Sequence, residues 1–255
     1  MNSARVEGLP FVHAVSNSAA LRRKNFLQTA ERIMRSLGPL GAVHLRSSEV
    51  TGRRFYDLAS KLVDTQNETG CWLIINDRVD VAASVGAKGI QLASHSLRVH
   101  EARTVAPNIP VGISIHSVEE AVAAESDGAS WCVAGTVFET PTHPHQPGAR
   151  IPFIVDVAHA ISIPIIAIGG VRPEQVALLK AAGAYGIATI RGAGWETDPQ
   201  HHDTDPSPGK TRLVGAPGAP AEEMITRYIS AYDWNSGSVE DHSNGERRPT
   251  GDSAE

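Results

Sequence analysis

The sequence predicts an α/β fold in which eight parallel strands close into a (β/α)8 TIM barrel. Short β-branched runs alternate with Ala-rich helical patterns along most of the chain, and strict strand–helix alternation indicates a parallel sheet with right-handed crossovers. The runs begin about 25 residues apart on average, which suits a compact strand–helix unit. Aromatic residues are only 5% of the 255 residues. Small and branched aliphatic side chains must therefore fill the core, as they do in covered parallel sheets.

The predicted strands are eight short apolar runs. In chain order they are Phe11–Val15, Ala42–Leu45, Trp72–Ile75, Gly89–Leu92, Val111–Ser114, Trp131–Ala134, Ile165–Ile168 and Gly186–Ile190. The helical patterns between them are Lys24–Arg35, Gly52–Val63, Val79–Val85, Leu97–Val105, Val118–Ser126, Phe153–Ile161 and Pro173–Ala182. Eight strands favour closure, because a barrel has no exposed edges and side chains just fill its interior.

An open doubly wound sheet is the alternative. It calls for a glycine-rich phosphate-binding turn after the first strand, and the residues Val15-Ser16-Asn17-Ser18 contain no glycine. The sequence therefore favours the closed barrel.

The domain prediction is one barrel formed by residues 1–193 together with residues 221–234. Between these parts, residues 196–220 are crowded with His, Asp, Pro and Gly and are predicted to be a flexible insertion. Ala221–Trp234 carries apolar residues at helical spacing and is predicted to dock as a terminal helix. Residues 235–255 are almost wholly polar, which predicts a disordered tail.

Composition excludes several classes of function. A formal net charge of −5 provides no basic surface for nucleic acid. No apolar run approaches the ~18 residues of a membrane span, and the first residues lack a signal-peptide pattern. The two cysteines, Cys71 and Cys132, lie in apolar runs, which predicts buried thiols in a reducing cytoplasm.

Candidate functional residues lie where the predicted strands end, since these ends form the active face of such barrels. His44 and Arg46 alternate with apolar residues and share a face. Arg46 at the strand tip offers a planar donor fork for phosphate or pyrophosphate, or a salt bridge at the rim. His44, lower in the barrel, either contacts substrate or is an interior histidine with satisfied hydrogen bonds.

Two further strand ends offer cation and anion ligands. Asn76-Asp77 follows an apolar strand and could hold a hard cation or a hydroxyl, although Asp77 could instead cap the next helix. Gly169-Gly170 precedes a helix and allows backbone N–H groups to approach a phosphate, although a tight turn alone would also explain the pair. Arg191, after the last strand, would add positive charge there.

The remaining candidates lie after the fourth, fifth and sixth strands. Gln91 and Thr136 are polar residues at strand ends, and the loop from Phe138 to Gly148 is rich in hydroxyl and imidazole groups, which predicts a lid or phosphate clamp. Its prolines prevent a helix that could present histidines to a metal. Ser114 and His116 end the fifth strand, but no nucleophile elbow surrounds Ser114, which argues against hydrolysis.

Taken in order, these segments resemble the thiamine phosphate synthase/TenI family over residues 10 to 193. The segments are Leu45-Arg46, Ile75-Asn76-Asp77-Arg78-Val79-Asp80, Gly89-Ile90-Gln91-Leu92, Gly112-Ile113-Ser114-Ile115-His116-Ser117, Val137-Phe138-Glu139-Thr140-Pro141-Thr142, Ile165-Ile166-Ala167-Ile168-Gly169-Gly170 and Ala182-Gly183-Ala184-Tyr185-Gly186-Ile187. The resemblance implies a (β/α)8 barrel that binds small phosphorylated heterocycles.

For the synthase branch, the resemblance implies Mg²⁺-dependent joining of hydroxymethylpyrimidine diphosphate to thiazole phosphate with release of pyrophosphate. The implied roles are pyrophosphate binding by Arg46, Asn76, Thr140 and Thr142, Mg²⁺ binding by Asp77, a pyrimidine contact by Ser114, and thiazole phosphate binding by Gly169 and Gly170. Two positions depart from the synthase pattern. Ser96 stands where synthases carry a second metal-binding aspartate, and His143 stands for the lysine after the Thr-x-Thr pair.

Two alternatives remain open at this stage. A TenI-like thiazole tautomerase needs no metal and uses a histidine after the sixth strand, where this chain has Thr136; His44 or His116 would then be the base. The second alternative is a non-catalytic barrel that binds thiazole phosphate or thiamine phosphate for regulation. In all three cases we expect small-molecule ligands, no nucleic-acid or membrane partner, and a cytoplasmic protein that could form a homo-oligomer.

Overall fold

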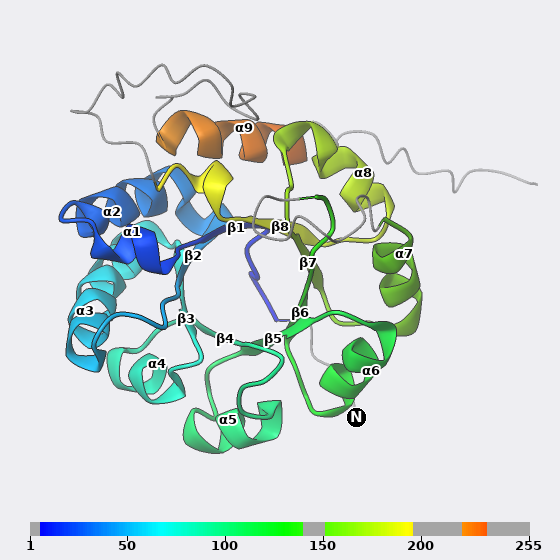
Figure 1. Ribbon diagram of the computed structural model, residues 1–255, viewed down its shortest axis with the longest axis horizontal. Coiled ribbons are helices and arrows are strands. Elements are labelled where there is room, and N and C mark those ends of the chain that lie inside the picture. Colours follow the sequence, from blue (N-terminus) through cyan, green and yellow to red (C-terminus); the bar gives the residue numbers. More distant parts are fainter. Residues whose placement is uncertain (1–5, 140–150, 196–220, 234–255) are drawn as a thin grey trace, which may run out of the picture.

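A closed barrel of eight parallel strands forms the centre of the computed structural model, which describes residues 6–139, 151–195 and 221–233 (Figure 1). Each strand pairs with its neighbours in chain order, and β8 pairs with β1 to close the ring. The strands are β1 Val12–Val15, β2 Gly41–Leu45, β3 Trp72–Asn76, β4 Gly89–Leu92, β5 Val111–Ile115, β6 Trp131–Ala134, β7 Ile165–Ile168 and β8 Gly186–Thr189. The predicted fold class and all eight predicted strands are confirmed, with ends shifted by at most one residue.

Helices surround the barrel on the outside (Figure 1). They are α1 Ser18–Arg22, α2 Phe26–Leu37, α3 Gly52–Thr69, α4 Val79–Val85, α5 Val99–Val105, α6 Val118–Ser126, α7 Ile151–Ala160, α8 Val176–Ala181 and α9 Ala221–Asp233, with short 3-10 turns η1 Gly38–Leu40, η2 Pro173–Gln175 and η3 Arg191–Ala193. The sequence did not predict α1. Its N-cap is Asn17, whose side-chain oxygen accepts a hydrogen bond from Ala20 N at 2.8 Å, which is typical of helix starts.

Alternate residues of each strand point into the barrel, and a separate apolar cluster fills it. The cluster includes Ala42, Ile74, Ile166 and Ala188 and is distinct from the larger core between strands and helices. Trp131 is its largest member and is fully buried. It fits because Gly112 faces it: a Cβ added at Gly112 would lie 2.0 Å from the indole nitrogen. A glycine on one strand thus makes room for the indole of the next.

Helix α9 lies over α2 and α8, next to the β1–β8 junction (Figure 1). Its buried side includes Met224, Ile225 and Tyr228, so the predicted docked helix is present. The predicted flexible insertion and disordered tail lie outside the described residues, and the domain boundaries stay a prediction. Among the described residues, no helix is long and apolar enough to cross a membrane.

Candidate active site

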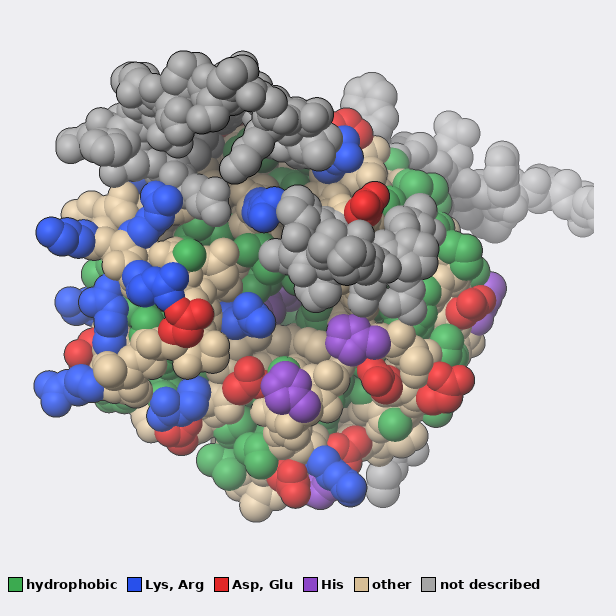
Figure 2. All heavy atoms as spheres, viewed as in Figure 1, with side chains coloured by type: hydrophobic (Ala, Val, Ile, Leu, Met, Phe, Trp, Pro, Cys, Tyr) green, Lys and Arg blue, Asp and Glu red, His purple; other side chains and the backbone are tan. Residues whose placement is uncertain are grey.

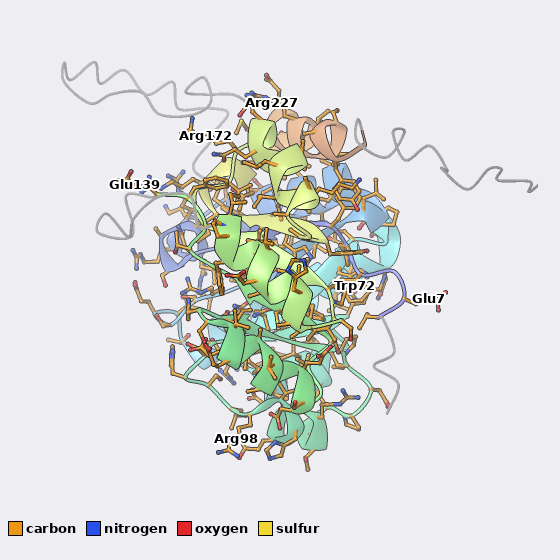
Figure 3. All side chains as sticks on the ribbon, turned by 90° about the vertical axis from the view of Figure 1, so that its right-hand side faces the viewer. Glu7, Trp72, Arg98, Glu139, Arg172 and Arg227 are labelled. Carbon is orange, nitrogen blue, oxygen red and sulfur yellow. The ribbon has the colours of Figure 1, made fainter. Side chains whose placement is uncertain are left out.

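The carboxyl ends of the strands open at one end of the barrel, which we call the mouth. In the side view of Figure 3, Glu139 and Arg172 lie at this end, whereas Trp72 and Glu7 lie toward the other. Figure 2 looks onto the mouth and shows Lys and Arg side chains gathered over the part of the rim formed by α1 to α4. An anionic ligand would therefore meet a positive potential on this side of the mouth.

Arg46 is held at the rim by its backbone. Its N–H donates to Ser16 Oγ at 2.9 Å, and the Ser16 hydroxyl donates to the Arg46 carbonyl at 3.4 Å, which ties the end of β1 to the end of β2. Ser16 is fully buried, while Arg46 is exposed. No described residue forms a salt bridge or hydrogen bond with the Arg46 guanidinium. The structure thus offers this donor fork to a ligand, and the alternative of a salt bridge at the rim finds no partner in residues 6–139, 151–195 and 221–233.

Asp77 ties β3 to β4 with both its backbone and its carboxylate. Its N–H donates to the Gln91 carbonyl at 2.9 Å, and its Oδ1 accepts from Ala93 N at 2.9 Å. The residue has a φ of 60°, a left-handed conformation that Asp and Asn adopt more readily than other side chains. The alternative that Asp77 caps the next helix is wrong: Arg78 is the N-cap residue of α4, and the Asp77 carboxylate bonds across to β4 instead.

The Asp77 carboxylate suits a Mg²⁺ ion whose other ligands are oxygens of water and of substrate phosphates. Oδ1 is engaged by Ala93, and Oδ2 has no partner among the described residues. The described residues also contain no group of three His, Cys, Asp or Glu side chains able to hold a metal. Mg²⁺ commonly binds through one or two carboxylates, with water and substrate phosphates completing its shell. Asp77 fits as the single protein carboxylate of such an ion.

A second polar chain inside the barrel orients Ser114. The Trp131 indole N–H donates to Gln91 Oε1 at 2.9 Å, and Gln91 Nε2 donates to Ser114 Oγ at 3.2 Å. An indole nitrogen can only donate, so the Gln91 amide has one possible orientation. Ser114 Oγ accepts from Gln91, which leaves its hydroxyl proton available to a ligand. Ser114 is therefore oriented as a donor.

His116 and Thr136 belong to the next two strand ends. His116 is exposed, and its Nδ1 donates to the Gly135 carbonyl at 2.9 Å, which links β5 to the residue after β6. Thr136 lies against the loop after β7, since a Cβ added at Gly169 would come within 2.5 Å of Thr136 Cγ2.

His44 is fully engaged inside the barrel. Its Nε2 lies 2.8 Å from His13 Nδ1, and its Nδ1 lies 3.2 Å from Asn76 Oδ1. Both rings are buried, His13 at 0% and His44 at 1% exposure. Burial lowers the pKa of His13 to about 4, and burial together with the neighbouring His13 lowers the pKa of His44 well below its usual value. His44 is thus a neutral interior histidine, and each of its ring nitrogens faces a polar atom of a neighbouring strand.

Gly169 and Gly170 form the rim after β7 in conformations that favour glycine. Their φ angles are 105° and 65°, and a Cβ added at Gly170 would lie 2.7 Å from the Glu139 carbonyl oxygen. Phe138 N donates to the Gly169 carbonyl at 2.9 Å. No described group accepts a hydrogen bond from the N–H of either glycine. Such N–H groups after the seventh strand of a barrel are the usual phosphate ligands.

Helix α9 supports the glycine pair and the loop after β8. The Tyr228 hydroxyl donates to the Val171 carbonyl at 2.8 Å. It also lies close to Gly192, where an added Cβ would be 2.4 Å from it. Arg191, which precedes Gly192, is exposed at the start of η3. The loops after β7 and β8 are thus held together by a residue of α9.

The strand ends are therefore joined around most of the mouth. Contacts run from Ser16–Arg46 through His44–Asn76, Asp77–Ala93, Gln91–Ser114, His116–Gly135 and Phe138–Gly169 to Tyr228–Val171. The predicted residues Arg46, Asp77, Ser114 and Gly169-Gly170 are on this one rim. Thr140, Thr142 and His143 lie outside the described residues, so their predicted roles stay predictions.

Three residues that orient the site were not assigned a role from the sequence: His13, Trp131 and Tyr228. Each lies within a predicted strand or helix, where the sequence pattern indicates only a packing role. The signal for His13 was its place on a strand next to His44 with the same inward alternation. The signal for Trp131 was the pair Gly89 and Gly112 on the two preceding strands.

Comparison with known proteins agrees with this geometry. The family profile described as "Thiamine monophosphate synthase" matches residues 12–193. The thiamine-phosphate synthase of Pyrococcus abyssi is 35% identical over 153 residues, which are 60% of this chain and 74% of that protein. That of Syntrophomonas wolfei is 34% identical over 181 residues, 70% of this chain and 86% of the relative.

A solved structure of thiamine phosphate pyrophosphorylase from Pyrococcus furiosus superimposes with a TM-score of 0.70. It is 24% identical in sequence, and the match covers 89% of this chain and 96% of that one. This likeness supports the barrel fold. With the profile covering most of the barrel and relatives above 30% identity, the chain belongs to the thiamine monophosphate synthase/TenI family.

Proposed function

We propose that this chain is a thiamine-phosphate synthase, a transferase of thiamine biosynthesis. It joins hydroxymethylpyrimidine diphosphate to thiazole phosphate and releases pyrophosphate. The family match and the named relatives support this function. The structural observation that carries the proposal is a single rim with four kinds of group: a guanidinium, a carboxylate, an oriented hydroxyl and two glycine N–H groups. The guanidinium and the glycine N–H groups have no partner among the described residues.

In the proposed reaction, the bond between the pyrimidine's methylene carbon and the diphosphate oxygen breaks, and the departing pyrophosphate takes the electron pair. A new bond to the thiazole then forms at that carbon. Stabilisation of the charge on the leaving group is the main catalytic task. Arg46 offers two parallel donors to pyrophosphate oxygens, and bound Mg²⁺, with Asp77 as its protein ligand, would neutralise further charge.

The other groups bind and orient. Ser114, fixed as a donor by Gln91, would contact the pyrimidine. The N–H groups of Gly169 and Gly170, with Arg191 nearby in the next loop, would hold the phosphate of the thiazole. Thr136, Thr140, Thr142 and His143 are proposed to complete the diphosphate side from the loop after β6. We also propose a cytoplasmic location and leave a homo-oligomer as a prediction.

The function is tested by incubating the protein with both precursors, with and without Mg²⁺, and detecting products by mass. We expect thiamine phosphate and pyrophosphate only when Mg²⁺ is present. Absence of both products at saturating Mg²⁺ would refute the proposal. Aromatised thiazole formed without metal would identify a tautomerase instead, and calorimetric binding with no product in either assay would identify a regulatory binding protein. For the tautomerase, the engagement of both ring nitrogens of His44 disfavours that residue as the base and leaves His116 as the candidate.

Gly170→Ala should raise KM for thiazole phosphate about tenfold or more. The new methyl group would meet the Glu139 carbonyl and force a residue with a φ of 65° to move, which displaces the N–H groups of the phosphate site. Steady-state kinetics with each substrate varied checks this. Gly183→Ala is the matched control, because Gly183 also has a positive φ and a close neighbour, Ala158, but lies in the turn that leads from α8 into the start of β8. It should lower stability and leave KM unchanged.

Trp131→Phe should raise KM for the pyrimidine diphosphate about fivefold to tenfold. The variant keeps a ring in the interior but removes the indole N–H that donates to Gln91 Oε1. The Gln91 amide is then held by its donation to the Leu92 carbonyl at 3.2 Å, so Ser114 is oriented less firmly. Trp195→Phe is the matched control: it removes a buried indole N–H that donates to Val15 O at 2.8 Å. Equal effects on KM from both variants would show that the Gln91 chain has no specific role.

A further inference from the structure

His13 and His44 form a hydrogen-bonded line that begins at the backbone and ends at the mouth. His13 Nε2 is 2.9 Å from the Pro10 carbonyl oxygen, His13 Nδ1 is 2.8 Å from His44 Nε2, and His44 Nδ1 is 3.2 Å from the Asn76 amide. The resemblance to synthases gave His13 no role. Both rings are buried, so each ring proton must have a protein partner.

The direction of this line is fixed at its buried end. A carbonyl oxygen only accepts, so the His13 proton is on Nε2. A neutral ring carries one such proton, which makes His13 Nδ1 an acceptor and His44 Nε2 the donor to it. The proton of His44 is then also on Nε2, and His44 Nδ1 must accept a hydrogen bond from Asn76.

An amide oxygen cannot supply that bond. Asn76 Oδ1 faces His44 Nδ1, which sets two acceptors against each other. A half-turn of the amide places Nδ2 at the same position, and the two orientations have nearly the same shape. With Nδ2 toward His44, the Asn76 oxygen faces the mouth.

The alternative is a charged ring, which the surroundings oppose. Both rings are buried among barrel side chains, and the charged group that acts on His44 is the cation Arg46. No carboxylate forms a hydrogen bond or salt bridge with either ring among the described residues. A buried imidazolium without an anionic partner is strongly disfavoured, so the pair is neutral.

We propose that His13 and His44 are positioning residues that hold Asn76 with its side-chain oxygen toward the mouth. Asn76 then accepts a hydrogen bond from an N–H or O–H donor on the pyrimidine half of the substrate or from cation-bound water. The family resemblance implied that Asn76 binds pyrophosphate. In the orientation proposed here, Asn76 does not donate a hydrogen bond to that group. Only the identity of the ligand rests on the proposed function, because the ring protons can be located without substrate.

The direct test is ¹⁵N NMR of the histidine-labelled protein at pH 7.5. The resonances of His13 and His44 are assigned by their loss in His13→Gln and His44→Gln. We expect both rings to be neutral with the proton on Nε2. A proton on His44 Nδ1, or a doubly protonated ring at either position, overturns the proposal even if the protein proves to have no synthase activity.

Two substitutions of His13 distinguish an effect of hydrogen-bond direction from an effect of lost packing. In His13→Gln, the new amide can donate to Pro10 and accept from His44, so the His44 proton stays on Nε2. In His13→Leu, His44 Nε2 loses its acceptor, and we expect the proton to move to Nδ1 and turn the Asn76 N–H groups to the mouth. KM for the pyrimidine diphosphate should rise about tenfold in His13→Leu and change less than about threefold in His13→Gln.

Cys71→Ala is the control for lost packing, because it removes a buried side chain that is not part of the line. It should leave both the NMR pattern and KM unchanged. Equal KM increases in the Gln and Leu variants, or a Leu variant with the wild-type ring pattern, would contradict the proposal. If His13→Leu does not fold, the NMR pattern of the wild-type protein and of His13→Gln decides alone.

Discussion

Asp77→Asn should lower kcat/KM for thiamine phosphate formation about 100-fold or more at saturating Mg²⁺. Asparagine keeps an oxygen that can accept from Ala93 N, and it tolerates the left-handed backbone at this position. The variant therefore removes the negative charge and little else. Loss of one group aimed at the charge of the transition state typically costs about 100- to 1,000-fold. Steady-state kinetics over a Mg²⁺ titration measures both the loss and any shift in metal requirement.

Asp80→Asn is the matched control for this change. Asp80 lies three residues further on, is exposed, and pairs with Arg78 at 2.6 Å. Asp80→Asn removes the same charge from a position in the first turn of α4. We expect little loss of activity or stability, because exposed ion pairs are weak. Similar losses in the two variants would mean that general electrostatics, and not a specific ligand at Asp77, explains the effect.

The second large effect is a loss of stability in mild acid that comes from the buried histidines. The pKa of His13 is about 4 in the folded protein, against 6.5 in the unfolded chain. Above pH 6.5, His13 is neutral in both the folded and the unfolded protein, so its full contribution to the free energy of unfolding is present. Between pH 6.5 and 4 only the unfolded chain takes up the proton, so the free energy of unfolding falls by an amount on the order of 3 kcal/mol. His44 acts in the same direction.

Urea unfolding at intervals from pH 7.5 to 4.5 tests this prediction. The window separates the histidines from Asp80, Glu125 and Asp127, whose pKa values are lowered in the fold and which lose their contribution only as the pH falls further. His13→Gln should flatten the dependence on pH. The exposed His159→Gln should keep the wild-type slope. An unfolding free energy that stays level across this window in the wild-type protein would contradict burial of a neutral pair.

Repeating patterns explain why the fold could be predicted and parts of the site could not. The eight strands follow from short β-branched runs at regular spacing, and the closed ring confirms them. The position of Arg46 at the mouth follows from alternation along one strand. Which atoms meet is a different question, because it depends on neighbouring strands. The bond between Asp77 and Ala93 joins residues from two strand ends, and no local pattern distinguishes it from a helix cap.

Helix α9 shows the same limit of prediction from sequence. Its amphipathic pattern predicted that it docks, but not where. Only the assembled barrel shows that the Tyr228 hydroxyl reaches the Val171 carbonyl beside Gly170. Residues 57 positions apart in the sequence thus meet at one rim, and such long-range contacts leave no trace in composition or spacing.

The anchoring of α9 by its own side chains has a practical meaning for protein engineering. The helix is fixed by its own side chains against α2, α8 and the Val171 carbonyl, so its place on the barrel follows from these contacts. For a flexible insertion, as the sequence predicts for residues 196–220, each doubling of length costs about 0.6 kcal/mol of closure entropy. On that prediction, a fluorophore tag inserted among these residues would label the protein at little thermodynamic cost.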